Sequence, residues 1–141
     1  MPDPLTDLRP STVRLEDIAV LYRSCADEVP AMQAAWASFE RAVGLHGRRF
    51  YGIFDPVAHE YRVCVKTRDG DDAAALEARE GVIPGGRYLR VILTGEPPGV
   101  YELIGPTFQR MEAASSVDPA RPFVEFYKRR DRIELLVPIS G

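Results

Sequence analysis

One arrangement of segments occurs twice along this chain, and the repeat constrains the fold more than any other feature. Each half runs through a strand pattern, a helix pattern and two further strand patterns. When RRFYGIF is aligned on RPFVEFY, Phe50 matches Phe123 and Gly52 matches Glu125. Similarity at a fixed offset predicts a duplicated unit, here over roughly residues 13–68 and 82–140.

The expected elements follow from the spacing of apolar residues. Helical spacing predicts a helix from Pro30 to Gly44. A second helix is expected over 100–111, either kinked at Gly105-Pro106 or beginning at Pro106, because proline clashes with the preceding turn. Two hairpin-bearing halves predict a mainly antiparallel sheet with helices on one side, an α+β fold. Strands are expected over 13–22, 49–54, 61–67, 88–93, 122–127 and 133–139.

Length and charge limit the classes of function. The 141 residues suit one domain, expected over 13–141, after a polar, proline-containing tail over 1–12 that we expect to be flexible. The formal net charge of −3 argues against a nucleic-acid or anionic-membrane partner, since both need a basic face. Without an apolar leader or a stretch of about 20 apolar residues, a cytoplasmic location is predicted.

Cysteine and histidine content argues against a metal or other cofactor. The two cysteines, Cys25 and Cys64, and the two histidines, His46 and His59, show no zinc-ligand spacing. Cys64 lies in an apolar strand pattern and is expected to be a core residue. No Ser-His-Asp or Cys-His set is evident either.

Glu125 is the residue that fits its surroundings least. Alternation along PFVEFY places Phe123, Glu125 and Tyr127 on one face of a strand. A carboxylate between two aromatic residues is costly to bury without a partner, so one interpretation puts Glu125 at the bottom of a cavity that attracts a cation. The alternative is an edge strand whose glutamate faces water.

Other side chains have two interpretations each. Glu134 is expected to form a solvated ion pair with Arg132. The basic tip Lys128–Arg130 is either a solvated turn or a site for phosphate or an acidic partner. Trp36 fits a helix core better than a ligand contact, and several of the six tyrosines are expected to line a cleft or pack at its rim.

The chain resembles a known family. IPGGRYLRVILTGEPPGVYELIGPTFQRM is similar to that family's Pro-Gly-Gly, tyrosine-led strand, turn and helix. PFVEFY followed by LLVPI resembles its closing hairpin, and YGIFDP with YRVCVKT resembles its first strand pair. The family is the GyrI-like small-molecule-binding domain, also found as the effector half of AraC-type and MerR-type regulators. The similarity extends over about residues 13 to 140.

This resemblance implies two strand-helix-strand-strand modules about a pseudo-twofold axis, with a cleft for flat, often cationic aromatic compounds. The family's central acid and its tyrosine match Glu125 and Tyr127, and Gly52 would leave space opposite. Weaker candidates for the walls of the cleft are Tyr51, Trp36, Tyr88, Tyr101 and Phe123.

Three functions compete. A binding module would sequester or sense aromatic compounds. A hydrolase, as some stand-alone relatives are, would open electrophilic cyclopropane-bearing toxins, with Glu125 activating water and Tyr127 or Tyr51 donating to the developing oxyanion. An inhibitor of gyrase or another protein partner would use an outer surface, such as the acidic stretch Asp69–Asp72.

A helix-turn-helix does not fit before Val13, so we expect a stand-alone member of the family. A second polar group facing Glu125 would separate the first two functions, and its position does not follow from the spacing.

Overall fold

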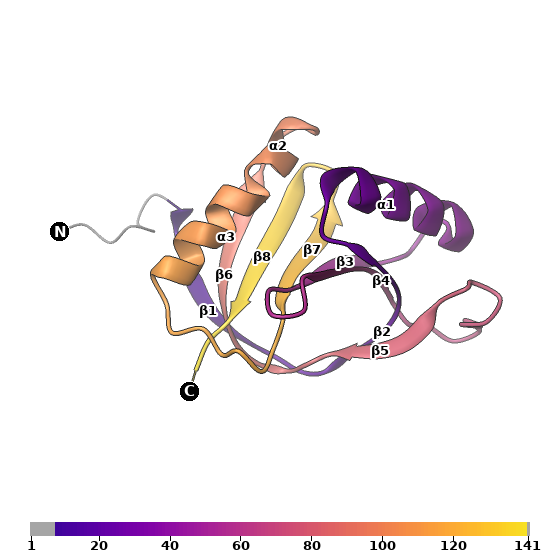
Figure 1. Ribbon diagram of the computed structural model, residues 1–141, viewed down its shortest axis with the longest axis horizontal. Helices are drawn as coiled ribbons and strands as arrows, with labels where there is room; N and C mark the ends of the chain where they lie inside the picture. Colours follow the sequence, from indigo (N-terminus) through magenta and orange to yellow (C-terminus); the bar gives the residue numbers. More distant parts are fainter. Residues whose placement is uncertain (1–7, 141) are drawn as a thin grey trace.

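One curled antiparallel sheet of eight strands carries the helices on one of its faces (Figure 1). The computed structural model describes residues 8–140. The strand order is β1-β6-β8-β7-β3-β4-β2-β5, and every neighbouring pair is antiparallel. This confirms the predicted α+β fold. The elements are β1 (Ser11–Leu15), β2 (Ile18–Ala26), α1 (Val29–Val43), β3 (Phe50–Asp55), β4 (Glu60–Lys66), β5 (Arg79–Ile83), β6 (Gly86–Thr94), α2 (Gly99–Glu102), α3 (Ile104–Ala113), β7 (Phe123–Arg129) and β8 (Arg132–Pro138).

The two aligned segments meet at the middle of the sheet. β3 and β7 are neighbours, and Gly52 pairs directly with Glu125. Outward from this pair the sheet continues as β4, β2 and β5 on one side and as β8, β6 and β1 on the other. Each half therefore contributes the three inner strands of its side, but the edge strands are exchanged: β1 pairs with β6 of the second half, and β5 pairs with β2 of the first. The descent of the halves from a duplicated unit stays a prediction.

The first helix forms where its apolar spacing predicts it. Pro30 lies in the first turn of α1, where a missing backbone N–H costs nothing, and Gly44 ends the helix with φ of 83°. Phe39 on its inner face is fully buried against Leu21 and Val63 of the sheet. Burying a phenylalanine side chain contributes about 2–3 kcal/mol, so this contact anchors α1 to the sheet.

The second helical segment is broken near its proline. α2 is a short turn of helix, and α3 begins at Ile104, which leaves Pro106 in the first turn of α3. There the absent N–H breaks no helical bond. α3 then packs Phe108 and Met111 into a cluster with Phe123 of β7.

Two expectations about strands were wrong. The segment expected as one strand over 13–22 is two strands, β1 and β2, which pair with different partners. Asp17 at the break accepts a hydrogen bond from the backbone N–H of Gly85 at 2.6 Å. β5 was not expected, because its residues are mostly exposed and lack apolar alternation.

The expected tail falls largely on residues 1–7, which lie outside the described part. Of the remaining tail residues, Leu8 packs against the helix-side core and Ser11 begins β1.

The face of the sheet away from the helices has its own core. Tyr51 and Ile53 of β3 belong to it, whereas their neighbour Phe50 packs on the helix side, as alternation along a strand requires. Cys64 is fully buried in this far-side core, which confirms its predicted structural role.

Candidate functional site

Glu125 lies in the middle of the sheet and is buried. β7 has β3 and β8 as neighbours, so Glu125 is not on an edge strand. Its side chain is on the helix side of the sheet with those of Phe123 and Tyr127, and only 5% of the residue is exposed. The interpretation of a water-facing glutamate is therefore wrong.

Two tyrosine hydroxyls converge on one oxygen of this carboxylate. Tyr61 from β4 donates to Oε1 of Glu125 at 2.7 Å, and Tyr127 donates to the same atom at 2.6 Å. The indole Nε1 of Trp36 in turn donates to the Tyr61 hydroxyl at 3.1 Å. We call these residues, Trp36, Tyr61, Glu125 and Tyr127, the Glu125 cluster. Within residues 8–140, no arginine or lysine pairs with Glu125 and no group donates to its Oε2.

Burial raises the pKa of every titratable group in the Glu125 cluster. Burial raises the pKa of Glu125, the two tyrosine hydrogen bonds oppose this shift, and the charge of Asp27 adds to it. Burial, followed by the charge of Glu125, raises the pKa of both Tyr61 and Tyr127 well above the ordinary value. Both phenols therefore stay protonated donors at neutral pH, and within residues 8–140 the Glu125 carboxyl group has no positive partner.

Gly52 makes the close approach of these groups possible. A Cβ atom at this position would overlap the hydroxyl of Tyr61 and would lie 2.5 Å from Oε1 of Glu125. Its backbone is ordinary strand, so space and not backbone conformation requires glycine here. The room expected opposite Glu125 is filled by the hydroxyl of Tyr61.

Aromatic rings connect the cluster to both helical regions. The rings of Trp36 in α1 and Tyr127 meet edge-on with centroids 5.2 Å apart. Tyr101 in α2 approaches Tyr127 at 6.4 Å from the other side. Tyr101 is 45% exposed and Leu103 is 48% exposed, so apolar surface at α2 lies open beside the buried acid.

The structure assembles some of the expected site residues and separates others. Tyr127 and Gly52 adjoin Glu125, whereas Trp36 is linked to it through Tyr61 and Tyr101 through Tyr127. Phe123 is on the same face but packs against Phe54 and Phe108 in the α3 core.

Tyr51 and Tyr88 lie on the opposite face, in the far-side core. Tyr51 stacks on Phe126 at 4.8 Å, because the residue next to Gly52 must point away from Glu125. The Tyr88 hydroxyl donates to the carbonyl of Pro84. Neither tyrosine can therefore serve as the wall or the oxyanion donor expected of it.

Tyr61 is the residue of this candidate site that sequence reasoning missed. It is the polar group facing Glu125 whose position the spacing did not reveal. Its only signal is the hairpin register, since Tyr61 pairs with Phe54, two residues along from Gly52 and on the same face.

Glu134 also departs from its expected role. It is only 8% exposed and lies on the far side of the sheet. Its carboxylate oxygens are 3.6 Å from Arg90 and 4.0 Å from Lys128, and they make no ion pair with Arg132. The expected solvated pair with Arg132 was wrong because β8 is an inner strand.

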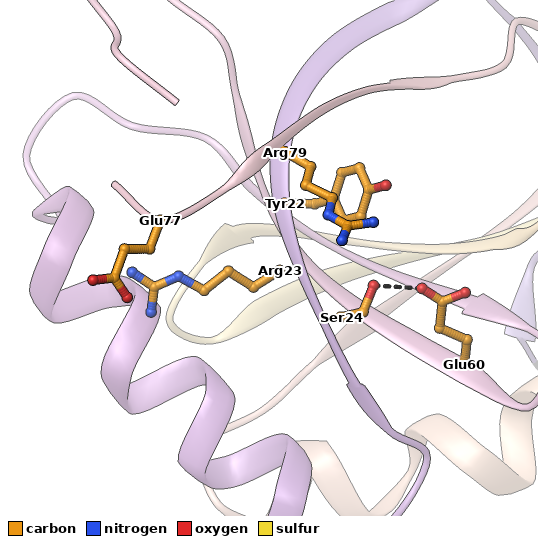
Figure 2. Close-up of a pocket in the computed structure, with 6 residues that line it drawn as sticks. All are labelled: Tyr22, Arg23, Ser24, Glu60, Glu77 and Arg79. Atoms are coloured by element: carbon orange, nitrogen blue, oxygen red, sulfur yellow. Dashed lines mark hydrogen bonds between the residues drawn. The ribbon is translucent and has the colours of Figure 1, made fainter. Parts of the chain in front are cut away.

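Two hollows lie away from the Glu125 carboxylate. The larger, of about 530 Å³, is at the β2–β5 edge (Figure 2). Its charges are mixed: Ser24 is hydrogen-bonded to Glu60, and Arg23 donates to Ser38 and to the carbonyl of Leu76. The second, of about 310 Å³, is lined by Arg48, Arg49, Phe126, Tyr127, Lys128 and Arg129.

Residues 8–140 contain neither a metal-ligand cluster nor a helix that could span a membrane. No group of three His, Cys, Asp or Glu side chains in that range is placed to hold a metal ion. Among the helices in that range, none has the length and apolar character needed to cross a membrane.

Comparison with known proteins finds likeness in structure only. No protein-family description and no curated protein matches the sequence. An integron cassette protein from the mobile metagenome of Vibrio cholerae superposes with a TM-score of 0.76 at 15% identity, over 93% of this chain and 95% of that chain. SAV2435 bound to tetraphenylphosphonium gives 0.65 at 13% identity, over 94% of each chain. A hydrolase from Listeria innocua gives 0.54 at 12% identity, over 93% of this chain and 91% of that chain. These likenesses are consistent with a GyrI-like fold, and at such identities they establish a shared fold alone.

Proposed function

We propose that this protein is a GyrI-like module that binds a flat, cationic aromatic small molecule at the Glu125 cluster. One observation carries the proposal: a carboxylate buried in the sheet has tyrosine hydroxyls as its only donors and no basic partner in residues 8–140. Buried carboxylates normally have a counter-charge. A ligand cation would supply it, and the faces of Trp36, Tyr127 and Tyr101 would add cation–π attraction and flat apolar contact.

The approach to the acid is from α2. α1 is anchored by the fully buried Phe39, whereas α2 is four residues long and presents Tyr101 and Leu103 to solvent. Displacing Tyr101 from Tyr127 gives up one edge-on ring contact, which is worth about 0.5–1.5 kcal/mol. Oε1 is held by both tyrosines, so Oε2 is the oxygen that would meet the cation. The structure with tetraphenylphosphonium bound to SAV2435 supports a cationic aromatic ligand, because the two proteins share a fold.

The test is titration with tetraphenylphosphonium, followed by calorimetry and thermal unfolding, with neutral triphenylphosphine oxide beside it. The wild type should bind the cation and not the neutral compound. Glu125→Gln should weaken cation binding by about tenfold or more, since a charge-assisted contact is lost. Glu134→Gln is the matched control, because it removes one buried carboxylate from the far side of the sheet. Equal cation affinity in Glu125→Gln and the wild type would refute the proposal.

The second candidate function is hydrolysis of an electrophilic small molecule. The raised pKa of Glu125 and the neighbouring phenol of Tyr61 favour it, because these are the properties of a general base beside an oxyanion donor. The hydrolase from Listeria innocua shares the fold and so supports the same idea. In this reaction Glu125 takes a proton from water, the water oxygen bonds to a ring carbon of an activated cyclopropane, and the broken C–C bond's electrons move to a conjugated carbonyl oxygen. Tyr61 replaces Tyr51 as the donor to that oxygen, and its hydroxyl proton must then turn from Oε1 of Glu125 to the new acceptor.

Product mass separates the two functions. Incubation with an electrophilic cyclopropane-bearing compound should add one water to it in the wild type, and Glu125→Gln should abolish this gain. Binding without any product, lost in Glu125→Gln, would leave the binding module and exclude hydrolysis of that compound.

A further inference from the structure

A basic hollow opens where β3 and β7 diverge. Phe50 and Tyr127 form the last pair between these strands. The carbonyl of Arg49 then turns to the backbone N–H of Lys66, while β7 runs on through Lys128 to the hairpin turn. The resulting space of about 310 Å³ is the hollow introduced above, and four cationic and two aromatic side chains line it. No acidic residue is among its lining residues.

Charges at this hollow are only partly compensated. Arg48 holds Asp71 through two hydrogen bonds of 2.8 Å, and its side chain is only 2% exposed. The Nε of Arg48 is nevertheless buried without a hydrogen-bond partner in residues 8–140. Lys128 reaches Glu134 only at 4.0 Å. Arg129 forms no ion pair within residues 8–140, so positive charge remains in excess.

We propose that the basic hollow binds the phosphate group of a small phosphate monoester, whose organic part rests against Phe126 and Tyr127. Guanidinium groups present paired donors that match phosphate oxygens, and Arg49, just before β3, and Arg129, at the end of β7, both line the hollow. The volume exceeds what a phosphate ion fills, and the aromatic side chains border the remaining space. A small ligand suits a hollow of this size and the chain's net charge of −3 better than a nucleic acid does.

This site is separate from the one proposed for the cation. It shares Tyr127 with the Glu125 cluster, but the Tyr127 hydroxyl already donates to Glu125, and none of the cationic residues of the hollow hydrogen-bonds that carboxylate. A phosphate monoester and an aromatic cation therefore meet different charges. The two proposals can fail independently.

The experiment is calorimetric titration at low ionic strength with adenosine monophosphate, inorganic phosphate, uncharged adenosine and a short DNA duplex. Adenosine monophosphate should bind more tightly than inorganic phosphate, and adenosine should not bind. The double variant Arg49→Gln with Lys128→Gln should weaken binding by about tenfold or more. Arg14→Gln with Arg79→Gln removes the same charge from the exposed outer strands β1 and β5 and should change affinity by less than about twofold.

Folding of both double variants is checked by thermal unfolding, which should match the wild type because Arg49, Lys128, Arg14 and Arg79 are all exposed. The charge-preserving exchange Arg49→Lys with Lys128→Arg should retain binding. Equal losses in both double variants, or no binding of either phosphate compound, would overturn the proposal. Binding of the duplex without binding of the monoester would overturn it in favour of a nucleic-acid surface.

Discussion

Replacing Gly52 with alanine tests the geometry of the Glu125 cluster directly. The new Cβ would overlap the Tyr61 hydroxyl, and it would lie 2.9 Å from Cζ of Tyr61 and 2.5 Å from Oε1 of Glu125. Real Cβ atoms do not approach other heavy atoms so closely, so the tyrosine and the carboxylate must move apart. Their hydrogen bond of 2.7 Å would then be lost in the middle of the sheet.

Three contributions determine how much Gly52→Ala changes the free energy of unfolding. Overpacking a core costs about 1–3 kcal/mol, and losing a hydrogen bond to a charged group costs about 1.5–3 kcal/mol. Exchanging glycine for alanine in ordinary strand backbone returns about 0.4–1 kcal/mol through the unfolded state. Gly52→Ala should therefore lower the free energy of unfolding by about 1.5–5.5 kcal/mol, which for a chain of this length lowers Tm by roughly 5–22 °C.

The assay is thermal and urea unfolding of the variant beside Gly99→Ala. Apart from its chain neighbours, nothing lies within 4 Å of a Cβ built at Gly99, the first residue of α2, so that exchange should stabilise the protein by about 0.4–1 kcal/mol. Adding Tyr61→Phe to Gly52→Ala removes the closest atom, so the pair should cost at least about 1 kcal/mol less than the sum of the singles. If Gly52→Ala is as stable as the wild type, the close approach of Tyr61 and Glu125 is wrong.

Three further predictions concern charge and hydrogen bonding. Because the pKa of Glu125 is raised in the folded protein, protonation of this residue stabilises the fold. This stabilisation is complete below the pKa of the unfolded state and is lost as the pH rises through the pKa of the folded state. Glu125→Gln should abolish this part of the pH dependence in urea unfolding. The hydrogen bonds from Arg48 lower the pKa of Asp71 to about 2, so Asp71→Asn should destabilise the protein at neutral pH, and the difference from the wild type should shrink as pH falls toward that value. Trp36→Phe removes the donor to Tyr61 and should cost about 1 kcal/mol in unfolding, while the single tryptophan of the wild type should change its fluorescence when tetraphenylphosphonium binds.

Much of the centre of this fold could be predicted from local patterns. Alternation alone placed Phe123, Glu125 and Tyr127 on one face, because a strand directs every second side chain the same way. The alignment of the two halves matched Gly52 with Glu125, and these residues are direct neighbours across β3 and β7. Glu125 and the glycine opposite it could therefore be predicted from the sequence alone.

The rest depended on contacts between distant segments. Tyr61 reaches Glu125 from another strand, 64 residues earlier in the chain, and only the register of the β3–β4 hairpin brings it to the same face. Tyr51 was assigned to the site by its neighbourhood in sequence, yet an odd offset from Gly52 sends it to the far-side core. β5 could not be predicted from apolar alternation, because the residues of this exposed edge strand do not need to alternate.

The difference between the halves explains why the centre of the sheet can hold a single charge. If each half carried a glutamate at the position of Gly52 and Glu125, two carboxylates would face each other across the central pair, and one would have to stay protonated. Glycine removes that repulsion, and it also opens the space through which the Tyr61 hydroxyl reaches Oε1. The tyrosines are complementary in the same way: Phe54 pairs with Tyr61 in one half, and Tyr127 pairs with Ile133 in the other. Each half thus supplies one hydroxyl and only one supplies the acid, and this single carboxyl group is the one that the proposed ligand cation would meet.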